Sequence, residues 1–182
     1  MSKWDSDKIF SVSAFLISVA TLATLVYQSQ IMREHQEKTS FPKLELWNNN
    51  SDTRYQLELK NTGMGPAILE EIKVVFNDST YELDPAQFAH RYKDTLNALY
   101  PLGTSSLRKG RVIEPGVRAW PINISYDSIR NHPIANIFRS EEATVIIRYS
   151  SVYQHQWEII GTGTAPTLLD EEPQVIKKLL GD

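Results

Sequence analysis

The sequence predicts a mainly β protein, in which an N-terminal transmembrane helix and stalk are followed by a β-sandwich with one or two inserted helices. Two observations support this fold class. No charged residue occurs between Ile9 and Met32, whereas 37 of the 41 charged residues follow that window. After Pro42, short runs of alternating apolar residues are separated by turn-forming residues, which is typical of an all-β domain rather than of alternating strands and helices.

The composition excludes several kinds of protein and of site. The chain has no cysteine, so disulfides, thiol nucleophiles, cysteine-ligated zinc and iron–sulfur clusters are all excluded. A formal net charge of −3 and a pI near 5.8 argue against a general nucleic-acid-binding protein. We therefore expect no nucleic acid among the partners of this chain. Because disulfides are excluded, we expect burial of the hydrophobic core to stabilise the domain.

The segment Ile9–Tyr27 is predicted to cross a membrane as a helix, behind a short polar N-terminus of residues 1–8. Fourteen of its 19 residues are hydrophobic. Nineteen helical residues span about 28 Å, close to the ~30 Å hydrocarbon core of a bilayer. Apolar residues occur on every face, unlike those of a helix that packs on a globular core. Its five Ser and Thr hydroxyls can bond to backbone carbonyls one turn back or lie at helix–helix contacts.

Two other interpretations of this segment stay open. The small residues Ser18-Val19-Ala20 suit cleavage of a signal peptide, but Asp5 and Asp7 weaken the positive N-terminal region that such a peptide needs. A buried helix of the soluble domain is disfavoured by the length of the charge-free run. Basic residues flank both ends of the segment in nearly equal number, and the positive-inside rule slightly favours a cytoplasmic C-terminal domain.

The first part of the remaining chain is expected to change from helix to strands. Residues 28–41 continue as a polar helical stalk, which the i,i+4 pair Arg33–Glu37 supports. Residues 42–162 form the β-sandwich domain, because their apolar pattern has a period of two. Asn77-Asp78 is a tight turn between two of its strands. The expected strands in this part contain Leu44 and Leu46, then Tyr55, Leu57 and Leu59, then Ile68–Phe76, then Tyr81–Leu83.

Helices are expected at two places inside the strand domain. Asp84 and Pro85 have the character of an N-cap and a first helical residue, and this helix is expected to reach about Tyr100. A second, short helical piece is expected around Ser128–Phe138, interrupted by Pro133. The first of these helices is an insertion that a simple seven-stranded sandwich lacks.

The later strands are expected to form two pairs. The first joins Ser106–Ile113 to Val117–Ile124, and the second joins Ala143–Ser150 to Gln156–Ile160. Residues 163–182 are expected to be a linker and a short C-terminal amphipathic helix, Pro173–Leu180, whose apolar stripe would dock on the domain, a second copy, the membrane or a partner.

The loop after the second expected strand carries the most specific motif. Two glycines and a proline cannot lie inside a paired strand, and we expect at least one of the glycines to need a positive φ. The four structural residues of this loop are Asn61, Gly63, Gly65 and Pro66.

The order of apolar segment, stalk, Pro42 and this loop resembles a group of uncharacterised bacterial membrane proteins. These proteins have one N-terminal transmembrane helix and an immunoglobulin-like β-sandwich marked by N-x-G-x-G-P-A, which reads Asn61-Thr62-Gly63-Met64-Gly65-Pro66-Ala67 here. The stretch Ile31–Gln36 is also similar to that group. The resemblance implies an immunoglobulin-like domain and a single-pass protein of the bacterial inner (cytoplasmic) membrane. It supplies no catalytic residues.

A search for catalytic and binding patterns leaves one candidate. The four histidines have none of the close spacings of metal ligands, and no G-x-S-x-G is present. The glycine-rich Gly161–Pro166 lacks the spacing and the lysine of a P-loop. The densest basic cluster is Arg108, Lys109 and Arg111, which could contact anionic lipid or a phosphorylated ligand. Its competing interpretation is a strand edge whose charges discourage pairing.

These observations predict a membrane-tethered, non-catalytic module that binds a protein or a small ligand through its β-sandwich. We expect no enzyme activity, no cofactor and no metal. The expected partners are the lipid bilayer and either another protein or a second copy of the chain. The alternative is a membrane-acting effector whose transmembrane helices oligomerise when the sandwich binds a signal.

Overall fold

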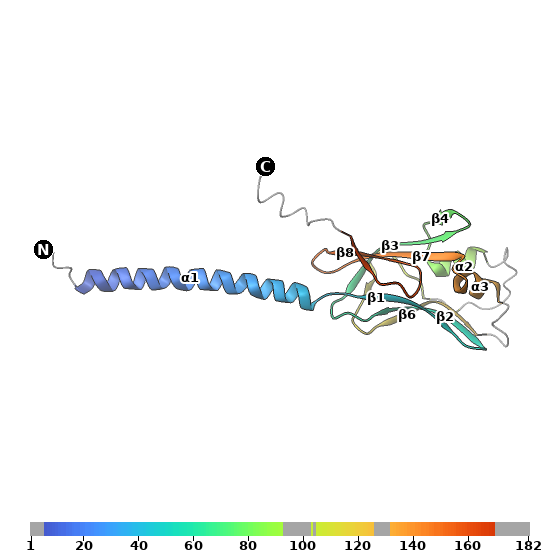
Figure 1. The fold of residues 1–182 in the computed structure, drawn as a ribbon, viewed down its shortest axis with the longest axis horizontal. Coiled ribbons are helices and arrows are strands. Elements are labelled where there is room, and N and C mark those ends of the chain that lie inside the picture. The colour runs from blue at the N-terminus through green and yellow to red at the C-terminus, as the bar shows by residue number, and fades with distance from the viewer. Residues whose placement is uncertain (1–5, 93–102, 104, 126–131, 170–182) are drawn as a thin grey trace. The chain divides into compact units, whose positions relative to one another are not determined.

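The computed structural model describes residues 6–92, 103, 105–125 and 132–169 (Figure 1). The chain divides into two compact units, Met1–Thr39 and Ser40–Asp182. The first unit contains one helix, α1 (Ser6–Thr39), and the second consists mainly of strands. An N-terminal apolar helix followed by a mostly β domain is thus confirmed.

Helix α1 combines the predicted apolar segment and the predicted stalk without a break. Its stretch Lys8–Glu37 is long and apolar enough to cross a membrane, a test that a signal sequence near the N-terminus also passes. The hydroxyls of Ser18, Thr21 and Thr24 donate to backbone carbonyls four residues earlier, at 2.8–2.9 Å. These polar groups are therefore satisfied inside the helix.

The polar end of α1 has the predicted ion pair. Arg33 Nε lies 3.2 Å from Glu37 Oε1, one helical turn away. Because both side chains are partly or largely exposed, this pair adds little stability, about 0.3–0.5 kcal/mol.

The strands of the second unit form two antiparallel sheets. Within the described residues, the smaller sheet has the order β1 (Leu44–Asn50), β2 (Arg54–Asn61), β6 (Arg118–Ser125). The larger sheet has the order β4 (Ser79–Tyr81), β3 (Ala67–Phe76), β7 (Ala143–Ser150), β8 (Gln156–Ile160), β9 (Thr167–Leu169), and β5 (Val112–Ile113) also pairs with β3. Two short helices complete the unit, α2 (Pro85–Tyr92) and α3 (Pro133–Arg139).

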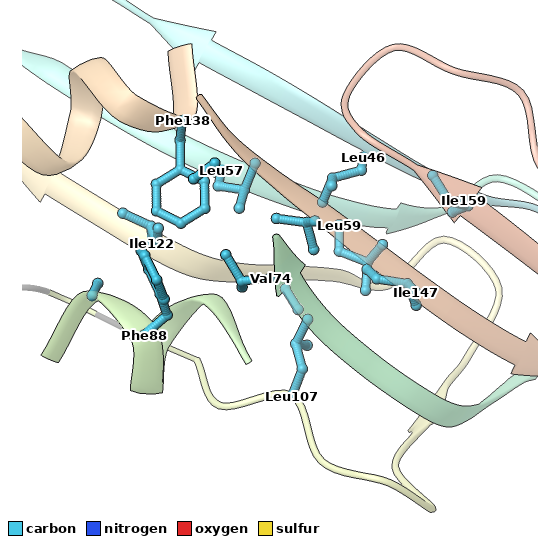
Figure 2. Packing of buried hydrophobic residues seen from close by; sticks show 14 of the residues in the cluster. Leu46, Leu57, Leu59, Val74, Phe88, Leu107, Ile122, Phe138, Ile147 and Ile159 are labelled. Atoms are coloured by element: carbon cyan, nitrogen blue, oxygen red, sulfur yellow. The ribbon is translucent and has the colours of Figure 1, made fainter. Parts of the chain in front are cut away.

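The two sheets and both short helices share one hydrophobic core. The alternation along β1 and β2 points Leu46, Leu57 and Leu59 inward, where all three are buried. They meet Val74, Ile147 and Ile159 of the larger sheet, and Phe88 of α2 and Phe138 of α3 close one end (Figure 2). Each such side chain contributes about 1.5–3 kcal/mol on burial, so this core is the main source of stability.

The outer edge of β1 is covered by the larger sheet and its loops. The Leu46 carbonyl accepts a hydrogen bond from Gly163 N–H at 2.8 Å, and the Leu44 N–H donates to the Tyr149 hydroxyl at 3.3 Å. Burial raises the pKa of Tyr149 to about 12, so this hydroxyl stays protonated at neutral pH. Covering this edge removes a site at which another strand could add to the sheet.

The turn Asn77-Asp78 is confirmed, and it explains the β3–β4 hairpin. Asn77 has φ 49° and Asp78 has φ 59°, the left-handed values of a type I′ turn. The β7–β8 hairpin is also confirmed, with Ile147 opposite Ile159.

The prediction for residues 106–124 is wrong in its pairing. Only Val112–Ile113 is a strand in the first segment, and it pairs with β3, whereas β6 pairs with β2 in the other sheet. The reason is that Gly116 and Val117 bond to the backbone of Asn61 instead of forming a hairpin: Gly116 N–H donates to the Asn61 carbonyl, and Asn61 N–H donates to the Val117 carbonyl. The connection between β5 and β6 therefore switches sheets.

Two other features differ from the sequence expectation. Pro133 begins α3 rather than interrupting a helix, because the first helical position needs no N–H donor. The larger sheet extends to β9, inside the segment expected as a linker, where Leu168 lies opposite Trp157. The predicted helix beyond Tyr92 and the predicted C-terminal helix Pro173–Leu180 lie outside the described residues.

Asp84 links the start of α2 to a distant part of the chain. One carboxylate oxygen accepts from Gln87 N–H at 2.7 Å, and the Gln87 side chain accepts from Asp84 N–H at 3.2 Å, which is a capping box. The other oxygen accepts from the Ser106 hydroxyl at 2.7 Å and from Leu107 N–H at 3.0 Å. Asp84 is only 3% exposed, so each of these donors depends on it.

Replacing Asp84 with Ala should lower the free energy of unfolding by about 2–4 kcal/mol, because it removes a helix cap and leaves the buried Leu107 N–H unpaired. Chemical denaturation of the full chain in detergent micelles, followed by near-UV circular dichroism, measures this change. The exposed neighbour Glu82, changed to Ala, is the control and should unfold like the wild type. Equal stability of the two variants would contradict the assigned role of Asp84.

Candidate functional site

The basic cluster predicted from the sequence lies in a tight turn rather than in a strand. Arg111 N–H donates to the Arg108 carbonyl at 3.0 Å, and Gly110 has φ 80°, a value that favours glycine. The Arg111 guanidinium donates to the Ser106 carbonyl at 2.6 Å and so holds the turn together. Arg108 and Lys109 are exposed, and after the larger effect of Lys73, Lys109 adds a small contribution to the lowered pKa of the Glu71 carboxyl.

The Glu71 carboxylate, near this turn, belongs to a row of ion pairs that crosses the larger sheet. Lys73 lies 2.6 Å from Glu71, and the hydrogen bond between them is the main cause of the lowered Glu71 pKa. Arg148 joins Glu71 at 3.1 Å to Glu158 at 2.6 Å. Positive and negative groups alternate along this row, so the face offers no strong field to an anionic ligand.

The predicted structural loop is organised by the buried side chain of Asn61. Its Nδ2 donates to the carbonyls of Gly65 and Ile113, both at 2.8 Å. Its Oδ1 accepts from the N–H groups of Gly63 at 3.0 Å and Lys43 at 3.3 Å. One carboxamide thus joins the loop, the β5 end and the segment that leads into β1.

Residues Ser40–Lys43, which follow α1 directly in the chain, are bonded to this loop along their backbone. The Phe41 carbonyl accepts from Met64 N–H at 2.9 Å and from Gly65 N–H at 3.2 Å, and the Lys43 carbonyl accepts from Thr62 N–H at 2.7 Å. We call Ser40–Lys43 the joining segment. Its backbone is therefore part of the strand domain from its first residues.

The two loop glycines are required by close approach and not by backbone conformation. Gly63 and Gly65 are absent from the residues with positive φ, so our expectation of a left-handed glycine here is wrong. A Cβ on Gly63 would overlap the Phe41 carbonyl oxygen and the Lys43 nitrogen, and one on Gly65 would overlap the Ser40 carbonyl. Pro66 lies immediately before β3, where the missing N–H costs no pairing.

The histidines do not form a site within the described chain. His35, His90 and His155 are exposed or half-buried on α1, on α2 and before β8, while His132 is buried at the start of α3, where burial lowers its pKa. Among the described residues, no group of three or more His, Asp or Glu side chains is placed to hold a metal ion.

A cavity of about 250 Å³ lies between the end of β8 and the turn that precedes β7, lined in part by Phe138, Glu141 and Thr162. The Thr162 hydroxyl accepts from the Asn48 side chain at 3.1 Å, and the Thr164 hydroxyl donates to the Ile160 carbonyl at 2.8 Å. These two threonine hydroxyls therefore bond to the chain itself.

The outer side of the smaller sheet carries a pair of exposed tryptophans. Trp47 on β1 is 49% exposed and Trp120 on β6 is 37% exposed. The two tryptophans lie on the strands either side of β2, at the level of Glu58. Trp47 is the partner of Glu58 in the β1–β2 ladder, and the Trp120-Pro121 bulge of β6 lies opposite Glu58 on its other side. We call this side of the sheet the tryptophan face; its other residues include Glu45, Asn49, Arg54, Gln56, Glu58, Lys60, Arg118 and Asn123.

Glu58 is the centre of the tryptophan face. It is only 7% exposed, although it points away from the hydrophobic core. Its carboxylate accepts a short hydrogen bond from the Asn49 side chain on β1 and lies 3.4 Å from Arg118 Nε on β6. A row of polar contacts thus crosses all three strands between the two indoles.

The positions of both tryptophans have local causes. Leu44 and Leu46 must face the core, so the alternation of β1 places Glu45 and Trp47 outside. On β6 the bulge puts two residues, Trp120 and Pro121, opposite Glu58, and bulges of this kind re-aim side chains. Proline is tolerated at such a position because a bulge leaves one residue outside the ladder.

The polar surroundings hold the Trp47 ring in place. Its Nε1–H donates to Glu45 Oε2 at 3.3 Å, and Lys43 Nζ lies 2.7 Å from Glu45 Oε1. The Lys43 hydrogen bond is the main cause of a lowered Glu45 pKa, with a smaller contribution from Trp47. On the other flank, Gln56 donates to the Asn123 side chain at 3.2 Å.

Sequence reasoning did not single out the tryptophan face, although part of its signal was available. The alternation that predicted Leu44 and Leu46 as core residues also predicts Trp47 on the opposite side of the strand. The Trp120 position could not be derived in the same way, because it depends on the bulge and on the pairing of β6 with β2.

Comparison with known proteins adds no further assignment: no protein-family model matches the chain, and no curated protein matches it either.

Replacing Gly65 with Ala should destabilise the strand domain by about 1–3 kcal/mol, the usual cost of forcing extra atoms into a close-packed site. The reason is the overlap with the Ser40 carbonyl. Thermal unfolding of the full chain in micelles measures the change. Met64→Ala is the matched control, because the side chain between the two glycines is 79% exposed. If Gly65→Ala melts like Met64→Ala, the joining segment does not constrain the loop.

Proposed function

We propose that this chain is a membrane-tethered, non-catalytic interaction module of the bacterial inner membrane. In this proposal the strand domain is an immunoglobulin-like β-sandwich, and it binds its partner through the tryptophan face. The observation that carries the proposal is the exposure of Trp47 and Trp120 on either side of the buried Glu58.

The magnitude of the apolar surface favours the tryptophan face over the basic turn. The two indole side chains together expose on the order of 200 Å², and covering that area is worth about 5 kcal/mol before the costs of binding. Exposed basic groups near anionic lipid contribute only about 1 kcal/mol each. Tryptophan and arginine are also the residues that most often dominate the binding energy of protein interfaces, and Arg118 lies beside Trp120.

The membrane tether rests on α1. Its apolar stretch is long enough to span a bilayer, and its hydroxyls bond to its own backbone. A cleaved signal sequence is the competing role for the same residues. Three basic residues follow the span, and two basic residues and the amino terminus precede it. The positive-inside rule, applied to these nearly balanced flanks, slightly favours a cytoplasmic strand domain.

A membrane-acting effector is the second candidate, and one observation favours it. Ser11, Ala14, Ser18 and Thr21 follow a spacing of three and four residues, so they lie on one face of α1. Small and hydroxyl-bearing residues allow transmembrane helices to approach closely. In this function the tryptophan face receives the signal, and the helices of several copies associate.

Replacing Leu16 and Leu22 together with Arg should abolish stable membrane insertion, because each central arginine costs about 2.5–3.5 kcal/mol on insertion scales. Alkaline extraction of bacterial membranes measures insertion, and a reporter fused after Asp182 gives the side of the membrane. We expect the wild type in the pellet at its full mass, with the reporter active in the cytoplasm.

Three results would contradict this account of α1. A mature protein that begins after Ala20 would identify a signal sequence. Recovery of the double variant in the washed pellet would show that the segment does not span the bilayer. A reporter that is active only outside the cytoplasm would reverse the orientation.

Replacing Trp47 and Trp120 together with Ala should abolish the capture of a partner without removing the protein from the membrane. Chemical cross-linking in intact membranes measures capture, and we expect the cross-linked species of the wild type to disappear. Ile160→Ala is the control, since Ile160 is 52% exposed on the other sheet. Identical cross-linking profiles for the double variant and the wild type would exclude the tryptophan face as the binding surface.

A further inference from the structure

We propose that the tryptophan face binds an extended, proline-rich peptide in the polyproline II conformation, with one proline ring against each indole. The inference rests on the proposed function, since it names the partner of the same surface. Three properties of the face lead to it: its size, the separation of the two tryptophans, and the polar groups around them.

The size of the face favours a narrow ligand over a folded protein. Three strands at ~4.8 Å each give a width of about 14 Å, and seven residues give a length of about 23 Å. The resulting planar footprint of about 330 Å² is small beside the ~800 Å² of accessible surface that each partner contributes to a stable interface. A second copy of the domain would therefore bury too little surface here for a stable dimer, whereas an extended peptide matches the width.

The separation of the tryptophans matches the repeat of a polyproline helix. Trp47 and Trp120 lie at the same level on strands that are two apart, so about 9.6 Å separates their backbones. Polyproline II has three residues per turn and rises ~3.1 Å per residue, so residues i and i+3 lie on the same edge about 9.3 Å apart. A peptide that crosses the strands can thus place two prolines on the two indoles.

The polar groups of the face suit a ligand that mainly accepts hydrogen bonds. Its carboxylates already have partners: Glu58 bonds to Asn49 and Arg118, and Glu45 bonds to Lys43 and Trp47. The donors that reach solvent are the Arg118 guanidinium, with its side chain 52% exposed, the Lys60 ammonium and the Asn123 amide N–H, since the Asn123 oxygen accepts from Gln56.

A polyproline helix is such a ligand. It has no internal hydrogen bonds, its proline residues lack N–H donors, and its carbonyls point outward to the solvent. Its backbone is also extended before binding, so little conformational entropy is lost on a flat surface. An oligosaccharide would both donate and accept hydrogen bonds, and the occupied carboxylates leave it fewer acceptors.

The test uses the full chain in lipid nanodiscs and fluorescence anisotropy of labelled peptides. The probe is a fluorescein-labelled decaproline, and a Gly-Ser decapeptide with the same label is the control. We expect saturable binding of decaproline only. Trp47→Ala and Trp120→Ala should each weaken binding by about tenfold or more, as for other central aromatic contacts, whereas Ile160→Ala should bind as the wild type does.

Equal binding of decaproline and the Gly-Ser peptide would overturn the inference, and so would unchanged affinity in both tryptophan variants. Cellohexaose is the probe for a glycan: saturable, tryptophan-dependent binding of this oligosaccharide, with none of decaproline, would assign the face to carbohydrate instead. In either case, loss of membrane cross-links in the Trp47→Ala, Trp120→Ala double variant would leave the proposed function standing. Retention of those cross-links would reject both.

Discussion

The buried carboxamide of Asn61 is the polar interaction on which the arrangement of the domain's connecting segments depends. Its four side-chain hydrogen bonds reach the joining segment, the β2–β3 loop and the end of β5. Its backbone also holds the connection that passes from the larger sheet to the smaller one. Since a buried polar group without partners costs about 1–3 kcal/mol, these segments must keep their positions together. The glycines at 63 and 65 then follow, because the joining segment passes too close for any side chain.

The sequence predicted the strands well where one face of each strand is buried. Leu57 and Leu59 had to point the same way, and a shift by one residue would have exposed both. The N-cap at Asp84 and the turn at Asn77-Asp78 were also predictable, because local hydrogen bonds and backbone conformation decide them. The partner of each strand was less predictable: the segment before Gly116 joins one sheet and the segment after it joins the other, which depends on a distant contact with Asn61.

The candidate site shows the same division between local and distant causes. The exposed position of Trp47 follows from the alternation along β1. The exposed position of Trp120, at the same level of the sheet, follows from a bulge in β6 that no local sequence pattern predicts. The basic turn was the stronger signal in the sequence, since three charges lie together. In the fold, one of the three basic residues holds its own turn and another lies near Glu71. Exposed aromatic area, with satisfied polar groups beside it, is the better physical criterion for a binding surface.

If the tryptophan face is the binding surface, partners contact the smaller sheet at Trp47 and Trp120. Site-specific photo-cross-linking tests it most directly, with a benzophenone amino acid placed at position 47, 120 or 160 of the full chain in intact bacterial membranes. We expect partner adducts from positions 47 and 120 and none from position 160, which lies on the other sheet. Adducts from position 160 alone, or the same adducts from all three positions, would contradict it.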